Sequence, residues 1–141
     1  MINIIYWSMT GNTEAMAEAV KAGVIEAGGS AELINVSDAD VSSLESASVF
    51  ALGCPAMGAE VLEEDEFEPF VEQVCEIASG KKIALFGSYG WGDGEWMRNW
   101  EDRMKEAGAE LVGDNGLIVN EEPDAEGIEK CKELGKLCAK I

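Results

Sequence analysis

Ser8-Met9-Thr10-Gly11-Asn12-Thr13 lies between an apolar run, Ile2 to Trp7, and an amphipathic segment, Glu14 to Ala27. The apolar run predicts a strand that is buried on both faces, and the spacing of apolar residues in the second segment predicts a helix. The stretch between them has hydroxyl and amide side chains and backbone N–H groups at the positive end of a helix dipole. Such a loop suits a phosphate, which neutral donors would hold because the loop has no Lys or Arg.

The composition predicts one globular domain, residues 1–141, with 47% hydrophobic and 27% charged residues. The formal net charge is −18, which argues against nucleic acid and anionic membranes as partners because both are polyanions. The acidic excess favours a basic protein partner, or simply high solubility.

Cysteine and histidine usage gives no indication of a metal site and favours a reducing compartment. The four cysteines (Cys54, Cys75, Cys131 and Cys138) have no metal-ligand spacing, and histidine is absent. We expect free thiols in a reducing cytosol. The first residues lack the basic region of a signal peptide, and no apolar stretch approaches the roughly 20 residues of a membrane span. We therefore expect a cytoplasmic protein.

Further apolar runs predict strands at residues 31–36, 48–53, 82–87 and 109–119, the last interrupted near residues 113–116. Residues 37–47 predict a polar connection with one helical turn. Helical patterns follow with Pro69 in a first turn, with Asp93 as an N-cap, and with Pro123-Asp124 at the start of the last helix. Strands that alternate with helices in this way predict a parallel sheet with helices on both faces.

The loops after the first, third and fourth strands should meet at one edge of this sheet, where ligands bind in such folds. Trp91 lies between glycines in the third of these loops. Its indole is interpreted either as a side chain folded back on a neighbouring helix or as a stacking platform for a flat ligand. Met57 would form the opposite wall. A phosphate at one end and an aromatic slot at the other describe a mononucleotide with a large planar ring.

The motifs at residues 8–13, 53–58 and 85–94 closely resemble those of the short-chain flavodoxins of anaerobic bacteria. The resemblance covers essentially the whole chain, including residues 66–70 and 122–124, and no long loop is inserted in the fifth strand. It implies a flavodoxin-like three-layer sandwich with a five-stranded parallel sheet of order 2-1-3-4-5. It also implies noncovalently bound FMN.

By this resemblance, Trp91 and Met57 stack on the two faces of the flavin, and Glu60 accepts its N3–H. The Met57-Gly58-Ala59 turn lies beside N5 and reorients on one-electron reduction. Ala59 stands where relatives often have Asp or Ser, so we expect altered semiquinone stability. The phosphate ligands are Ser8, Thr10, Asn12 and Thr13. The full implied set of cofactor-binding residues adds Met9, Gly11, Pro55, Ala56, Gly58, Ala59, Ser88, Tyr89, Gly90, Gly92, Asp93 and Gly94.

The resemblance implies a monomeric low-potential electron carrier that shuttles between oxidised, neutral semiquinone and anionic hydroquinone states, and not an enzyme. Seven of the thirteen residues from Glu60 to Glu72 are acidic. They are interpreted either as a solvated surface or as a docking site for basic patches on redox partners.

Other classes fit the sequence less well. A P-loop would need Gly-Lys-Ser/Thr, and a phosphatase loop would need an Arg after Cys54. A cofactor-free receiver domain would need acidic residues at the ends of the first and third strands, where Tyr6-Trp7-Ser8 and Gly53-Cys54-Pro55 stand. An FMN-binding module of a reductase system remains the main alternative.

Overall fold

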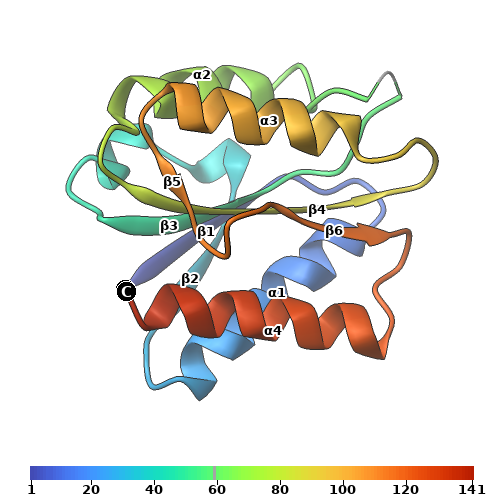
Figure 1. Ribbon diagram of the computed structural model, residues 1–141, viewed down its shortest axis with the longest axis horizontal. Helices are drawn as coiled ribbons and strands as arrows, with labels where there is room; N and C mark the ends of the chain where they lie inside the picture. Colours follow the sequence, from blue (N-terminus) through green and yellow to red (C-terminus); the bar gives the residue numbers. More distant parts are fainter. Residues whose placement is uncertain (59) are drawn as a thin grey trace.

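The central sheet is parallel throughout in the computed structural model, which describes residues 1–58 and 60–141 (Figure 1). Its strands are β1 (Ile2–Tyr6), β2 (Ala31–Asn35), β3 (Val49–Gly53), β4 (Lys82–Tyr89), β5 (Glu110–Leu111) and β6 (Leu117–Asn120). The order is β2-β1-β3-β4-β5, and β6 also pairs with β4. The predicted order 2-1-3-4-5 is confirmed, with the interrupted fifth strand present as β5 and β6.

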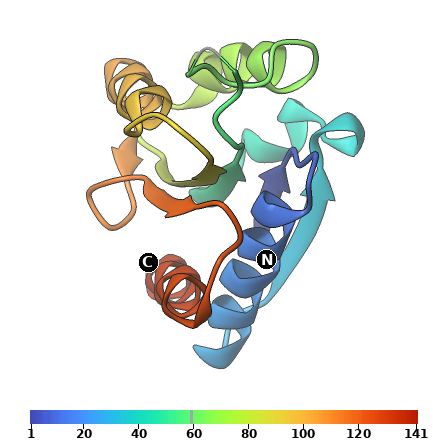
Figure 2. The same cartoon turned by 90° about the vertical axis from the view of Figure 1, so that its right-hand side faces the viewer.

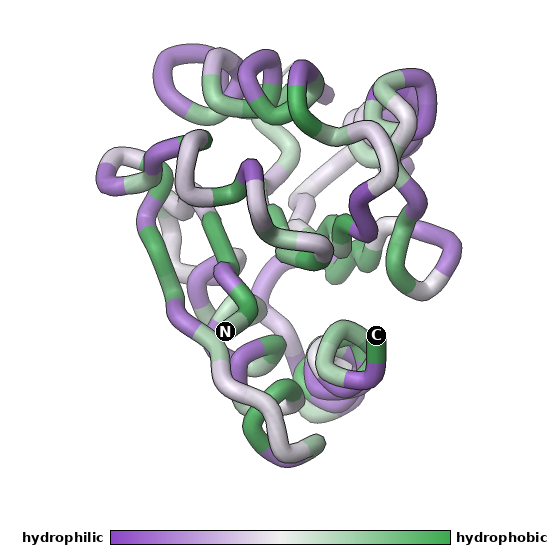
Figure 3. Tube along the Cα trace, turned by 90° about the vertical axis from the view of Figure 1, so that its left-hand side faces the viewer, coloured by the Kyte–Doolittle hydropathy of each residue, from purple (hydrophilic) through white to green (hydrophobic). Residues whose placement is uncertain are grey.

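Two helices cover each face of the sheet, which gives the predicted three layers (Figure 2). Helices α1 (Asn12–Glu26) and α4 (Ala125–Ala139) lie on one face, and α2 (Phe67–Ile77) and α3 (Glu95–Glu106) lie on the other. The central strands β1, β3 and β4 are buried along most of their length, whereas hydrophobic and hydrophilic residues alternate along the helices (Figure 3). This pattern is expected of strands buried on both faces and of helices that bury one face.

The two cores on either side of the sheet are filled differently. On the α2 and α3 side, aromatic rings fill the core, and Phe67 meets Trp100 edge-on at 5.6 Å. On the other side, α1 and α4 approach so closely that a Cβ at Gly135 would lie 2.0 Å from the carbonyl oxygen of Val20. A Cβ at Gly23 would lie equally close, 2.0 Å, to a backbone oxygen of α4. The position of α1 therefore depends on backbone-to-backbone packing.

The start of α3 differs from the prediction. Asp93 was predicted to be the N-cap, but the N-cap is Gly94, with φ +92° and no side-chain cap. The Asp93 carboxylate instead pairs with Arg98 at 3.1 Å. The left-handed conformation of Gly94 moves the helix start one residue along, out of reach of the Asp93 side chain. By contrast, the last helix starts at Pro123-Asp124 as predicted, and the Asp124 carboxylate caps it by accepting the N–H of Gly127 at 2.8 Å.

Two other boundaries also differ. Strand β4 continues through Ser88 and Tyr89, which were predicted to lie in a loop, because β6 pairs with both residues. The polar connection after β2 has two 3-10 turns, Val36–Asp38 and Val41–Leu44, rather than one helical turn.

The four cysteines are free, as predicted. Burial raises the pKa of Cys54 to about 12, so this thiol stays protonated and unreactive. Across residues 1–58 and 60–141, none of the helices combines the length and the apolar character that crossing a bilayer requires.

Candidate functional site

A cavity of about 270 Å³ opens where the loops after β1, β3 and β4 meet. These are the loops that were predicted to converge, and they do so at the carboxyl ends of the strands, where the sheet order reverses between β1 and β3. The residues that line the cavity are Trp7, Ser8, Met9, Thr10, Asn12, Thr13, Pro55, Ala56, Met57, Gly58, Ser88, Tyr89, Gly90 and Glu121.

One end of the cavity is the start of α1. The N-cap Gly11 is left-handed, with φ +94°, and no side chain caps the helix from that position. The Ser8 hydroxyl accepts the N–H groups of Gly11 and Glu14 at 3.2 and 3.3 Å. Further N–H groups of the first turn have no partner within the helix, which is the usual property of a helix start. None of the lining residues is Lys or Arg, so this end offers neutral donors to an anion.

A hydrogen bond between Thr13 in the first turn of α1 and Ser88 near the end of β4 connects the first and third loops. The Thr13 hydroxyl lies 3.2 Å from Ser88 Oγ, and it accepts the Ser88 N–H at 3.4 Å. Thr13 is only 1% exposed. Its hydroxyl makes hydrogen bonds to Ser88, and Thr13 also lines the cavity, so its role as a phosphate ligand stays a prediction.

The second loop is a tight turn. The Met57 N–H donates to the Val61 carbonyl at 2.9 Å, and the Glu60 N–H donates to the Met57 carbonyl at 2.8 Å. Met57 is half-buried and lines the cavity. The expectations for Ala59 lie outside the described residues.

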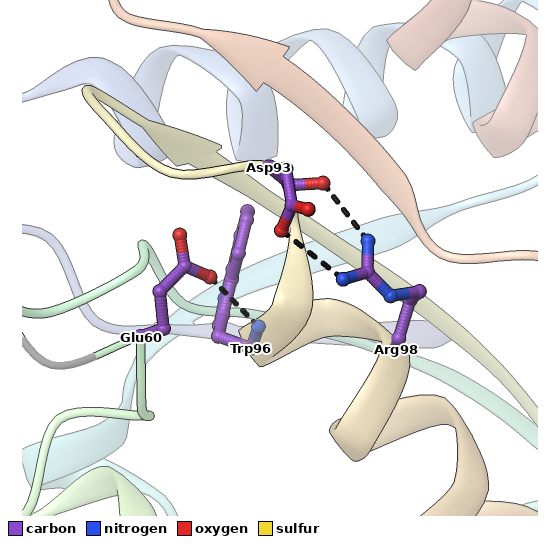
Figure 4. Close-up of polar contacts among 4 residues, drawn as sticks. All are labelled: Glu60, Asp93, Trp96 and Arg98. Atoms are coloured by element: carbon purple, nitrogen blue, oxygen red, sulfur yellow. Dashed lines mark hydrogen bonds and ion pairs between the residues drawn. The ribbon is translucent and has the colours of Figure 1, made fainter.

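Glu60 connects this turn to the start of α3 (Figure 4). Its Oε2 accepts the Trp96 N–H at 2.9 Å, whereas its Oε1 is buried and has no hydrogen-bond partner among residues 1–58 and 60–141. A Cβ at Gly92 would lie 1.6 Å from Oε1, so the loop backbone covers this atom. Glu60 is not among the residues that line the main cavity; it lines a separate, smaller one. A buried acceptor without a donor is unfavourable, so an N–H group of a ligand fits this position.

The Trp91 indole is 68% exposed and does not enter the hydrophobic interior. The interpretation in which it folds back on a helix is therefore wrong. Trp91, Gly92, Asp93 and Gly94 lie outside the cavity lining, next to the part formed by Gly90. Gly92 and Gly94 have φ of +90° and +92°, a conformation that disfavours other residues.

Three residues near the cavity were missed by sequence reasoning. Trp7 and Glu121 line it, and Asn120 Nδ2 donates to the carbonyls of Tyr89 and Gly90 at 3.3 and 3.2 Å. Trp7 directly follows the first strand, so its place at the carboxyl edge could have identified it. The roles of Asn120 and Glu121 depend on the pairing of β6 with β4, which no local pattern reveals.

Fold and site together define a doubly wound α/β protein with a loop of neutral donors and a cavity at the switch point of the sheet. A family model described as flavodoxin matches residues 4–135. The chain is 54% identical to a flavodoxin from Clostridium beijerinckii, over 99% of this chain and 100% of that protein. It is 49% identical to a flavodoxin from Megasphaera elsdenii, over 99% of each.

A solution structure of two-electron reduced Megasphaera elsdenii flavodoxin superposes with a TM-score of 0.91 at 48% identity, covering 100% of both chains. The chain belongs to the flavodoxin family. It is an FMN-binding electron carrier, as are its close relatives, and not an enzyme.

Proposed function

We propose that the cavity at the carboxyl ends of β1, β3 and β4 holds FMN, with the phosphate at the start of α1 and the ring between the other two loops. The observation that carries this proposal is the meeting of three loops around the start of α1, where none of the described cavity-lining residues is Lys or Arg. The unpaired Oε1 of Glu60 supports it, because the N3–H of a flavin is a donor that this atom lacks.

Individual residues take the following parts in this proposal. Ser8, Thr10 and Asn12 bind the phosphate with side chains and backbone N–H groups, and Met9 and Gly11 contribute backbone only. Met57 and Trp91 form the two walls of the ring slot. Backbone groups of the remaining predicted residues border the ring: Pro55, Ala56, Gly58, Ala59, Tyr89, Gly90, Gly92, Asp93 and Gly94. Thr13 and Ser88 support the site through their mutual hydrogen bond.

Bound FMN supplies one-electron transfer between partner proteins. The chain's own residues set the ease of each step. A backbone carbonyl in the turn from Met57 to Glu60 would accept a hydrogen bond from the N5–H of a reduced flavin. None of the cavity-lining residues that the structure describes is basic, and the chain carries a charge of −18, so these surroundings disfavour added negative charge. We infer a low potential for the second electron.

The acidic segment from Glu60 to Glu72 is the surface that we assign to redox partners with basic patches. Glu64, Asp65 and Glu66 are exposed there, and opposite charges steer association in a salt-dependent way. The electron-transfer rate with a basic partner should fall steeply between low and high ionic strength. A rate that does not depend on salt contradicts this docking surface.

We further propose that residues 1–141 form one monomeric domain of a cytoplasmic carrier.

The decisive experiment titrates the FMN-free chain with FMN and with riboflavin, which lacks the phosphate. FMN should bind one-to-one and far more tightly than riboflavin. Asn12→Ala should weaken FMN alone, because it removes a donor at the start of α1. Ser30→Ala, an exposed change after α1, is the matched control and should alter neither affinity. Equal affinities for the two flavins contradict the proposed phosphate loop.

A further inference from the structure

A carboxylate lies in the first turn of the helix that begins at the phosphate loop. Glu14 is the third residue of α1 after the N-cap Gly11. In a capping box, where Ser or Thr is the N-cap, a glutamate at this position bends back to accept the N–H of the N-cap residue. The helix dipole also favours a negative charge there. In that conformation Glu14 would occupy donors that the proposed function assigns to a phosphate, and it would repel the phosphate.

The structure holds the Glu14 carboxylate in a different place. The Tyr6 hydroxyl donates to Glu14 Oε2 at 3.0 Å. In a capping box the Glu14 carboxylate would accept the N–H of Gly11. Here that N–H donates to the Ser8 hydroxyl at 3.2 Å instead. Glu14 therefore does not make the usual contact with the N-cap, and its carboxylate is bound on the β1 side of the helix.

Tyr6 is a fixed anchor. It is the last residue of β1, it is 9% exposed, and its side chain belongs to the core that β1 shares with α1 and α4. Burial, the hydrogen bond to Glu14, and the charges of Glu14 and Glu18 raise the pKa of Tyr6 above its ordinary 10.0. The phenol thus remains a protonated donor at neutral pH.

We propose that Tyr6 is a positioning residue for cofactor binding, whose hydroxyl holds the Glu14 carboxylate away from the N–H groups at the start of α1. This inference rests on the proposed function of the loop from Ser8 to Thr13. Neither Tyr6 nor Glu14 lines the cavity, so the effect on the phosphate passes through the position of the carboxylate. It explains how a loop without Lys or Arg accepts an anion although an acidic residue follows it directly.

The test uses Tyr6→Phe, which keeps the ring and removes only the hydroxyl. The FMN-free chain is titrated with FMN and with riboflavin. The affinity for FMN should fall about three- to tenfold, the scale of one charge in the first turn of a helix. The affinity for riboflavin should not change, because riboflavin has no phosphate to repel. A purely structural role of Tyr6 would weaken both flavins alike.

Second-site variants identify the responsible charge. Tyr6→Phe combined with Glu14→Gln should recover the wild-type affinity for FMN. Tyr6→Phe combined with Glu18→Gln is the matched control, because Glu18 also faces Tyr6 but lies one turn further from the loop; it should not recover the affinity. Glu14→Gln alone should change FMN binding less than twofold, and this variant keeps the test valid if Tyr6→Phe folds poorly.

Three results overturn the inference: Tyr6→Phe binds FMN as tightly as wild type, it loses both flavins equally, or Glu14→Gln alone strengthens FMN binding severalfold. Wild-type protein that does not distinguish FMN from riboflavin contradicts the proposed function itself, and with it the positioning role. The two failures are therefore distinguishable.

Discussion

The two ends of the candidate site are built in different ways. At the phosphate end, Thr13 is buried and bonded to Ser88, and α1 is fixed by direct backbone packing against α4. At the ring end, Trp91 is exposed in a glycine-rich loop, and a hydrogen bond from Trp96 to Glu60 joins the start of α3 to the turn after β3. The core thus sets the phosphate end, whereas a few local contacts set the ring end. Changes to buried contacts should therefore affect stability, whereas changes to exposed loop contacts should affect binding.

Gly135→Ala should have the largest effect, because its Cβ would meet the backbone of Val20 at 2.0 Å. Backbone atoms cannot move aside as a flexible side chain can, so we expect a loss of about 3 kcal/mol in the free energy of unfolding. Urea denaturation measures it. Gly90→Ala, at the ring end, is the control, since nothing lies within 4 Å of its added Cβ. Equal losses in the two variants would remove the contrast between the ends.

Glu63 makes the stability of the ring-end face depend on pH. Burial raises the pKa of its carboxyl, but the N–H groups of Phe67, Glu66 and Asp65 lower it by more, so the pKa lies below its ordinary 4.5. Glu63 therefore stabilises the fold above pH 4.5, and this stabilisation is lost as the pH falls through the lower, folded-state pKa.

Glu63→Gln should lower the unfolding free energy at pH 7 by about 2 kcal/mol, because an amide replaces a charged acceptor at the start of α2. Urea denaturation of both proteins over a pH series tests this. The difference should shrink below pH 4.5. A difference that stays constant down to strongly acidic pH would show that the Glu63 charge is not the cause.

Gly92→Ala should act mainly on binding at the ring end. Its Cβ would collide with Glu60 Oε1, and alanine disfavours φ +90°. We expect displacement of Glu60 from Trp96 and about a tenfold loss of affinity, equivalent to about 1.4 kcal/mol, for FMN and riboflavin alike. Fluorescence titration with both flavins measures it. A loss of affinity for FMN but not for riboflavin would place the effect at the phosphate end and contradict the assignment of Gly92 to the ring end.

Thr13→Val should give the smallest effect, a loss of about 1 kcal/mol in unfolding free energy, because it leaves Ser88 without its partner. Thr10→Val, at an exposed position of the same loop, is the matched comparison. It should leave stability unchanged and weaken FMN. Urea denaturation should therefore show a loss of stability for Thr13→Val only, and FMN titration should show a loss of affinity for Thr10→Val. Equal changes of stability and affinity in the two variants would contradict the distinction between the buried and the exposed hydroxyl.

Much of this architecture was predictable from the sequence, because apolar runs and helical spacing alternate clearly and parallel strands bring their loops to one edge. The convergence of the Ser8, Met57 and Gly90 loops follows from that alone. The contact from Glu60 to Trp96 was not predictable, because it joins residues 36 positions apart. The prediction of Asp93 as the N-cap was wrong for the same reason. A local capping pattern does not show that Gly94 adopts a left-handed conformation, nor that the Glu60 carboxylate binds the first turn of α3.

Backbone amide chemical shifts during titration test the two-ended site most directly. FMN should shift the amides of residues 8–13, 56–58 and 88–94 together, whereas inorganic phosphate should shift only residues 8–13. Shifts that FMN causes outside these segments, for instance in the separate cavity formed by Gly113, Gly116 and α4, with none at the start of α1, would contradict the proposed site.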